Sequence, residues 1–536
     1  MRINFHLFAL TIWGLLSFCQ PYSAFAGRSP GGENNQDHRV QAVPGEKILL
    51  GDAIALALQA NPTVKILEEK VNQSKGNLQA ATGQFDWTAF AAASYLEEKL
   101  PLDSASLLAA RLSGIDEHIS NGIVVYSLSA TKQFRSGISV SPSVINTDFN
   151  TNTDLLPPIS RSGVNFSITI PLMRGYGEEN TGAIELAAKE DLAATRLNSK
   201  QAIASVVLGT AIDFWNCLAS TMTLELTEDT MLRAERLLSM VEKMVQAGTL
   251  EPASLNQAKA KLYGNKADLT DGRNNLYVNK QALAVDMGFT SENIANAPDL
   301  SGKFPEIPSS SAIKSKDPSK YIEIALGSRA DYEAMKINIK KAVILLAKAR
   351  NDAKPQLDLD ASLGYAGLND SGRNDRFIKS LTNNVTGLNT FVSLSLALPI
   401  QNNTAKGNIH LRASQVREAQ LLLNQLSNNI SSSVLVSYNS LRSAMEGYQL
   451  SSRAEEAYKL AVNHEAQKYR SGLSNLTNVI DIEDRYFKAR ISTIEAMRKY
   501  AVALAQFRFN TGTLLESDDD RITLKSQSLL ELPEFM

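Results

Sequence analysis

The sequence has few of the residues that build catalytic and metal centres. It contains two cysteines, Cys19 and Cys217, and its five histidines are scattered, with no pair at the helical spacing of metal ligands. Two distant cysteines do not form the disulfide framework of small secreted domains, and zinc sites need clustered cysteine or histidine. The chain also lacks a phosphate-binding P-loop motif. We therefore expect no enzyme activity, no cofactor and no metal site.

An excess of charge of either sign is also lacking. The 54 Lys and Arg residues nearly balance the 56 Asp and Glu residues, which gives a formal net charge of -2 at pH 7. Nucleic-acid-binding domains usually carry a basic excess that neutralises phosphates. Nucleic acid is therefore not an expected partner of this chain.

The first 26 residues have the pattern of a secretory signal peptide. An apolar core covers residues 5–18, and Ala24 and Ala26 supply the small residues of a cleavage site. The rest of the chain has no run of about 18 apolar residues, so no transmembrane helix is predicted there. An exported chain of this kind can still enter a membrane as a β-barrel, which is built from short strands of alternating polarity.

The remaining chain contains one pattern twice. Residues 57–61 align with residues 325–329 at a shift of 268, and residues 164–171 align with 392–399 at a shift of 228. The first copy therefore carries 40 extra residues between its two strands, and these form either an additional hairpin or longer strands. Each copy is predicted as helix, strand, loop, strand, very long helix, turn and helix, and such self-similarity indicates an internal structural repeat.

Four segments are predicted as β-strands: 85–97, 163–171, 355–368 and 389–399. The clearest alternation is in the second segment, where Val164, Phe166 and Ile168 alternate with Asn165 and Ser167. One face suits lipid or a core, and the other suits water. Four strands cannot close a barrel, since about eight is the usual minimum, and an open edge in hydrocarbon leaves backbone groups unsatisfied. Further copies of the chain must complete the sheet.

The predicted helices are too long for one globular core. Residues 182–247 contain no proline, and a helix of roughly 60 residues is about 90 Å long. Apolar residues recur every seven positions over 409–448, with one four-residue step, which is coiled-coil spacing. Gly248 and Gly472 mark the turns of two helical hairpins. An isolated coiled-coil rod has this spacing too, but it does not explain strands within the same repeat.

These patterns divide the chain into six segments. They are a signal peptide at 1–26, a flexible lead-in at 27–47, a first repeat at 48–297, a linker at 298–318, a second repeat at 319–512 and a disordered tail at 513–536.

The order and duplication of these elements resemble the TolC-like outer membrane efflux proteins. The motifs that carry the resemblance are Ala57-Leu58 with Asn61-Pro62, Pro171 to Gly175, and the hairpin sequences that begin at Gly248 and Tyr469. The resemblance implies an α+β membrane protein and a homotrimer. Its 12-stranded β-barrel, with four strands per chain, crosses the lipid of the outer membrane of a Gram-negative bacterium. A long α-helical coiled-coil barrel continues it across the periplasm.

The function implied by the resemblance is a passive exit duct of a tripartite efflux pump or a type I secretion system. Small molecules or polypeptides would arrive from an inner-membrane pump of the RND, ABC or MFS type through a periplasmic adaptor, or membrane fusion, protein. The alternative hypothesis is a periplasmic coiled-coil rod, structural or adhesive, that forms no pore.

The resemblance also implies roles for residues of the two hairpins. The residues that match the tunnel tip gripped by adaptors are Ala247, Gly248, Thr249, Ser471, Gly472 and Leu473. Asp481 matches the deeper of two acidic positions in the pore constriction, and Asn478 occupies the shallower one. Tyr469 matches a residue of the latch that closes the tip, whereas Ser474 and Ser254 replace its arginine and aspartate. We therefore expect a less charged constriction and a weaker ionic latch.

Overall fold

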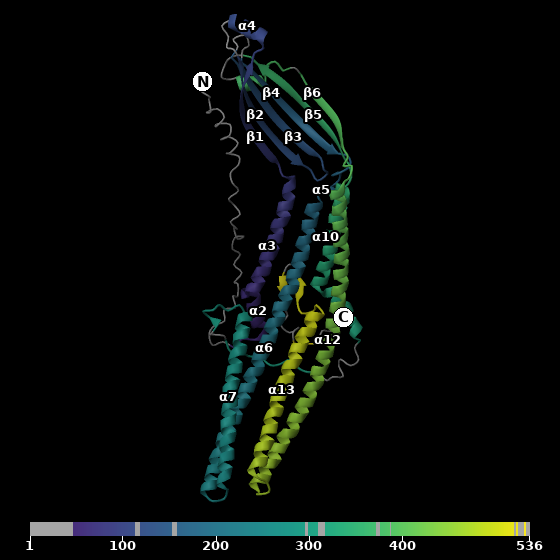
Figure 1. Ribbon diagram of the computed structural model, residues 1–536. Helices are drawn as coiled ribbons and strands as arrows, with labels where there is room; N and C mark the ends of the chain where they lie inside the picture. The colour runs from purple at the N-terminus through teal and green to yellow at the C-terminus, as the bar shows by residue number, and fades with distance from the viewer. Residues whose placement is uncertain are drawn as a thin grey trace. The chain divides into compact units, whose positions relative to one another are not determined.

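The computed structural model of the chain describes residues 47–112, 118–152, 158–294, 298–308, 317–370, 376–385, 387–518, 521–523 and 530–531. The predicted signal peptide and all of the predicted lead-in except residue 47 lie outside these ranges, as does the middle of the predicted linker. The described residues form one large antiparallel sheet and a set of long helices (Figure 1).

The large sheet has six strands, which follow one another in chain order without a crossover. They are β1 (Thr88–Pro101), β2 (His118–Gln133), β3 (Ser139–Thr151), β4 (Ile159–Pro171), β5 (Gln356–Asn369) and β6 (Asn389–Ala397). The prediction of four strands per chain is therefore wrong. The extra residues of the first copy form the hairpin β2–β3, in which Gln133 pairs with Ser139 beside the turn. The hairpin was difficult to recognise because both faces of β2 contain apolar residues.

Cross-strand register gives this sheet one apolar and one polar face. Val140 pairs with Ile168, which pairs with Ala361, so their side chains share a face. The neighbouring row, Ser141, Ser167 and Ser362, lies on the other face. On that polar face the Thr169 hydroxyl donates a hydrogen bond to Asp360 Oδ1 at 2.6 Å. Next to the helices, hydroxyls and carboxylates thus line one side of β3, β4 and β5, and aliphatic side chains cover the other. Towards the opposite ends of the strands, Asn146, Ser160 and Ser162 lie on that second side.

Four long helices lie side by side next to the sheet, and two of them run on into hairpins (Figure 1). The helices with their bounds are α2 (Leu50–Ala60), α3 (Pro62–Thr82), α4 (Ser104–Leu112), α5 (Glu178–Thr181), α6 (Ala183–Gln246), α7 (Pro252–Asp286), α9 (Pro318–Ser328), α10 (Ala330–Asp352), α11 (Arg376–Ser380), α12 (Asn403–Arg470) and α13 (Leu476–Asn510). α3 packs against α6, α6 against α10, and α10 against α12. α6 pairs with α7 and α12 pairs with α13, which forms the two hairpins.

One stretch of α6 is apolar enough, by length and composition, to cross a membrane, and 56% of it is buried inside the protein. Phe214 and Trp215 are among its buried residues, and the Trp215 ring stacks on Phe304 at 5.5 Å between centroids. Packing against other helices and against the segment after α7 accounts for this apolar composition, as it does in core helices of water-soluble proteins.

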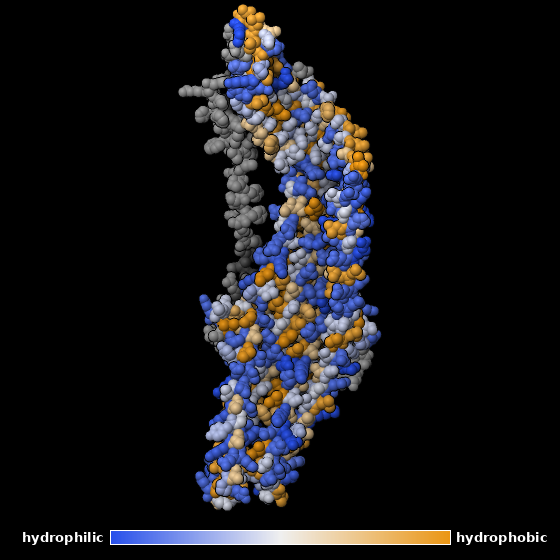
Figure 2. Space-filling model, viewed as in Figure 1, coloured by the Kyte–Doolittle hydropathy of each residue, from blue (hydrophilic) through white to orange (hydrophobic). Residues whose placement is uncertain are grey.

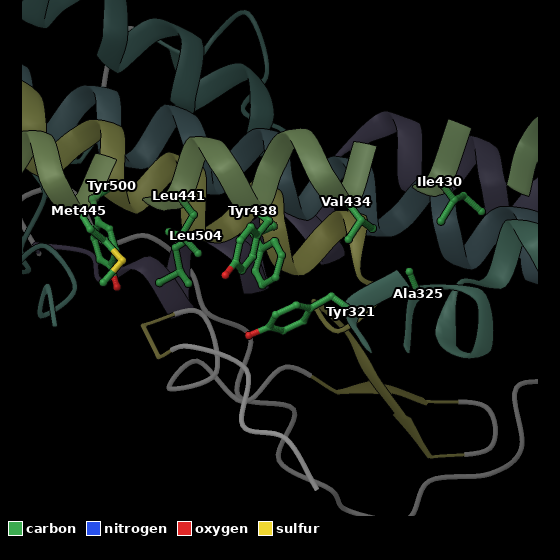
Figure 3. Packing of buried hydrophobic residues seen from close by; sticks show 10 residues of the cluster. Tyr321, Ala325, Ile430, Val434, Tyr438, Leu441, Met445, Tyr500 and Leu504 are labelled. Atoms are coloured by element: carbon green, nitrogen blue, oxygen red, sulfur yellow. The ribbon is translucent and has the colours of Figure 1, made fainter. Parts of the chain in front are cut away.

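A second aromatic cluster attaches α9 to the hairpin of α12 and α13 (Figure 3). The Tyr321 ring of α9 meets Tyr438 of α12 at 5.8 Å and Phe507 of α13 at 4.9 Å. Tyr321 and Phe507 are 4% and 1% exposed, so both rings are almost fully removed from water. Buried aromatic rings contribute large apolar area, and here they join helices that lie far apart in the sequence.

Part of the tail that was predicted to be disordered is structured. β7 (Glu516–Asp518) and β8 (Arg521–Thr523) form a short antiparallel pair. The buried Arg508 side chain donates hydrogen bonds to the Glu531 carbonyl at 2.8 and 2.5 Å. The C-terminal segment therefore returns to α13.

Two acidic side chains lie together at the contact between α6 and α7. Burial raises the pKa of Asp286 to about 6, and the negative charge of Asp213 adds to this shift. Burial also raises the pKa of Asp213, and a hydrogen bond with Asn216 lowers it by a smaller amount. A Cβ atom at Gly209 would lie 3.2 Å from Asp286 Oδ2, so the carboxyl group rests directly on α6.

Asp286 makes the stability of this region pH-dependent. Its folded-state pKa lies above the reference value of 3.8, so the folded chain holds the proton more tightly than the unfolded chain does. The contribution of Asp286 to stability is therefore most favourable below about pH 4 and becomes less favourable as the pH rises to about 6. We predict that Asp286→Asn raises the guanidinium unfolding midpoint, followed by circular dichroism, at pH 7.5 but not at pH 4. The control is Asp268→Asn at an exposed position of α7, and a wild-type midpoint for Asp286→Asn at pH 7.5 would contradict the prediction.

Candidate functional site

The far ends of the two hairpins have the same turn geometry. Gly248 and Gly472 adopt the left-handed conformation, with φ of +69° and +71°. In each turn the residue after the glycine donates its backbone N–H to a helix carbonyl, Thr249 to Met244 and Leu473 to Lys468, both at 2.9 Å. This arrangement is the Schellman ending of a helix, in which a residue without Cβ is strongly favoured.

All six residues predicted at the tips lie on these turns, and all are exposed. Leu473 has the most exposed of the large side chains there, at 79%. Such an apolar side chain has no covering group within the described part of the chain. The tips therefore present backbone turns and small side chains to a partner.

A small apolar cluster joins the two hairpins next to their tips. Val241, Ala258 and Leu476, from α6, α7 and α13, are buried against one another. Tyr469 packs against this cluster, and its buried hydroxyl group has no hydrogen-bond partner among the described residues. The structure thus places Tyr469 in apolar packing at the contact of the hairpins.

An ion pair also joins the hairpins, between Lys261 of α7 and Asp484 of α13. Closer to the tips, Thr477 Oγ1 lies 3.4 Å from Gln257 Oε1 in a second polar contact between the same helices. Glu483 lies beside the ion pair, and burial raises its pKa against the opposing charges of Arg233 and Lys261. Sequence reasoning missed Lys261 and Asp484. The sequence offered one signal for this contact, because Lys261 follows Gly248 at nearly the same distance along the chain as Asp484 follows Gly472.

Ser474 and Ser254, the residues that replace the ionic latch, both contact their own hairpin. The Ser474 hydroxyl donates a hydrogen bond to Glu465 of α12, and this bond lowers the pKa of Glu465. The Ser254 N–H bonds to the Glu251 carbonyl in the first turn of α7. The ionic contact between the hairpins therefore lies further from the tips, at Lys261 and Asp484.

The two residues predicted at the constriction lie on the first turns of α13. Asn478 is exposed, and its side chain reaches Ser474 Oγ at 3.4 Å. The Asp481 side chain is 60% exposed and forms an ion pair with Arg485 at 2.9 Å. Sequence reasoning missed Arg485, although spacing of four residues on a helix is the usual signal of such a pair. Asp481 is therefore accompanied by a positive charge one turn away.

No group of three or more His, Cys, Asp and Glu side chains is arranged to hold a metal ion within the described ranges. Cys217 is buried, and burial raises the pKa of its thiol to about 11. A thiol of this kind is protonated at neutral pH and is a poor nucleophile and metal ligand.

The chain combines a two-faced sheet with long helical hairpins whose exposed tips have matching turns. The sequence matches the family described as outer membrane efflux protein over residues 151–288 and 321–513, which is more than half of the chain. The chain therefore belongs to the outer membrane efflux protein family, the family of the TolC-like channels, whose members are non-enzymatic transport proteins.

Solved structures with the same fold come from several bacteria. A membrane protein from Pseudomonas aeruginosa is 15% identical, with a TM-score of 0.61 over 86% of this chain and 93% of that one. The CmeC outer membrane channel of Campylobacter jejuni is 15% identical, with a TM-score of 0.61 over 91% and 94%. The outer membrane protein VceC of Vibrio cholerae is 16% identical, with a TM-score of 0.60 over 86% and 96%. A search of curated protein sequences finds no significant match.

The tip glycines give a first test of the site. A Cβ atom at Gly472 would meet no atom within 4 Å, so any cost of Gly472→Ala comes from the left-handed backbone alone, about 1–2 kcal/mol. We predict faster hydrogen–deuterium exchange over residues 465–480 in this variant, with exchange in the sheet unchanged. The control is Gly447→Ala within α12, which also has open space and should leave exchange unchanged or slower. Equal effects of the two substitutions would contradict the assignment of the turn.

The ion pair between the hairpins gives a second test. Lys261→Met keeps the length of the side chain but leaves Asp484 and Glu483 without this cation, so the hairpins should separate more often. We predict a several-fold slower reaction of a short thiol cross-linker between Gln257→Cys and Thr477→Cys, measured by mass spectrometry. Lys259→Met, at an exposed position of α7, is the control. Adding Asp484→Asn to Lys261→Met should restore much of the rate, and a wild-type rate in Lys261→Met alone would show that the pair does not hold the hairpins.

Proposed function

We propose that this protein is the outer-membrane duct of a tripartite efflux pump or a type I secretion system. Three copies form a tube, with the sheets in the lipid of the outer membrane of a Gram-negative bacterium and the helices across the periplasm. Substrates pass through it passively. The observation that carries the proposal is the combination, in one unit, of a two-faced sheet with helical hairpins that end in exposed tips.

The polarity of the sheet supports a membrane wall around a wet lumen. Membrane barrels have an apolar outer band and a polar interior, and the register of β3, β4 and β5 separates side chains in this way. The helices supply the length. α12 has 68 residues, which corresponds to a rod of about 100 Å.

The element lengths support two structural repeats, at 48–297 and 319–512. α2 and α9 each have 11 residues, and α7 and α13 each have 35. Both copies also break their first helix at an extended residue, Asn61 with ψ 125° and Arg329 with ψ 123°. Two similar halves per chain would give a tube of three copies a wall of nearly six-fold regularity.

The tips support a role for a periplasmic adaptor protein, which would join the duct to an inner-membrane pump of the RND, ABC or MFS type. Two identical turns project from two hairpins, and Leu473 offers an exposed apolar side chain on one of them. Repeated small turns with an apolar contact suit recognition by another helical hairpin.

Planar-bilayer conductance of the detergent-purified protein, together with its mass, tests this function. Trimers that give stepwise currents support a duct. We predict that Asp481→Asn raises the permeability of anions relative to cations and that Arg485→Gln lowers it, because each removes one charge per copy from the constriction. Asp229→Asn breaks a similar pair with Arg233 on α6 and is the control. A protein that is extracted without detergent and forms no channel would contradict the proposal and favour a periplasmic rod.

A further inference from the structure

The hairpin β2–β3 stands between two strands that are neighbours in the simpler half of the molecule. β1 follows α3 as β5 follows α10, and β4 precedes α5 and α6 as β6 precedes α12. β5 and β6 pair directly, whereas β2 and β3 separate β1 from β4. The hairpin is therefore an addition to one of the two similar halves.

Over the half of the strands next to the β2–β3 turn, the added hairpin continues the apolar and the polar face of β4. Leu128 of β2 pairs with Val144 of β3, which pairs with Val164 of β4, so these three share the apolar face. On the polar face the hydroxyl groups of Thr131 and Ser141 lie 3.1 Å apart. A hairpin that folded into the lumen as a plug would not need an apolar face in register with its neighbours. β2 and β3 therefore belong to the wall.

The two edges of the sheet are suited to each other. β1 and β6 each have one partner strand among the described residues, and nearly all of their side chains are exposed. Figure 2 shows hydrophobic residues gathered along the β6 border, where Val392, Leu394 and Leu396 are 70%, 63% and 64% exposed. β6 carries no charge and no proline, the usual means of protecting a free edge. In hydrocarbon, its unpaired backbone groups would each cost several kcal/mol.

The direction of the strands allows these edges to pair in a ring. Every neighbouring pair in the sheet is antiparallel, and the number of strands is even, so β6 runs opposite to β1. The β6 edge of one copy therefore meets the β1 edge of the next in antiparallel order. The same contact can repeat around an axis until the ring closes, which is the geometry of a cyclic homo-oligomer.

From these observations we infer that three copies close through β6 and β1 into an 18-stranded barrel, with six strands from each chain. This inference rests on the trimer of the proposed function, and the lumen is incomplete without the other two copies. Each copy thus pairs through β6 with one neighbouring copy and through β1 with the other. Because barrel diameter grows roughly linearly with strand number, the lumen is about half as wide again as that of a 12-stranded barrel.

The width of the helical wall agrees with six strands. Four helices lie side by side next to the sheet, in the order α3, α6, α10 and α12. At about 10 Å per helix they cover an arc of about 40 Å. Six strands about 4.8 Å apart and tilted by about 45° cover about 41 Å.

Cryo-electron microscopy of the detergent-purified trimer tests the inference. We expect a closed barrel in which each copy contributes six strands and β6 pairs with β1 of the next copy. A trimer in which β2 and β3 leave the wall, so that β1 pairs with β4, would overturn it while leaving the duct intact. A dimer or another number of copies would also overturn it. Absence of channel activity would instead contradict the proposed function, so the two failures are distinguishable.

A deletion variant gives a second, independent measurement. Joining Pro101 to Ile159 by a short Gly-Ser linker removes β2 and β3 and leaves the helices intact. We expect a trimer whose barrel narrows by about a third while the helical wall keeps its diameter. A matched variant that replaces only residues 104–112 (α4) by the same linker should keep the full width. A deletion variant with an unchanged barrel diameter would overturn the inference, and if this variant does not fold, the strand count in the intact trimer decides.

Discussion

The requirement that every backbone hydrogen-bonding group in a sheet find a partner is the constraint on which this structure depends. Six strands with an apolar face are stable in lipid only if both edges are paired, and a sheet this narrow cannot curl back on itself. The even, antiparallel strand order gives each chain two edges that suit the next copy. In the duct that we propose, the sheet determines how the copies assemble, and the helices that continue its strands follow that arrangement.

The helical part is held together differently. Its hairpins are long rods, and within one chain they meet near the tips through the small cluster of Val241, Ala258 and Leu476 and the ion pair of Lys261 and Asp484. Farther from the tips, Tyr321 joins α9 to α13, and Trp215 joins α6 to the segment after α7.

Much of the local structure was predictable from the sequence. The bounds of α6 agree with the predicted helical segment 182–247 to within one residue, because 3.6-residue periodicity and Gly248 act over a few positions. The family was recognised from motifs such as Asn61-Pro62 and the hairpin sequence at Tyr469, whose residues are also close together along the chain. The sequence left open whether the 40 extra residues form a hairpin or longer strands, because the alternation in β2 is weak and the faces of the hairpin become distinct only beside β1 and β4. Arg485 was missed although its spacing from Asp481 was visible, and the tip residues were located without their contacts.

The sequence by itself determined where helices begin and end, where the chain reverses at its two tip glycines, and to which family it belongs, since each depends on residues that are close along the chain. Only the tertiary structure decided that six strands stand in one sheet, that β4 pairs with β5, and that Lys261 meets Asp484. These contacts join residues far apart in sequence. Whether such contacts form depends on how the intervening helices pack together, and a pattern of a few neighbouring residues does not contain this information.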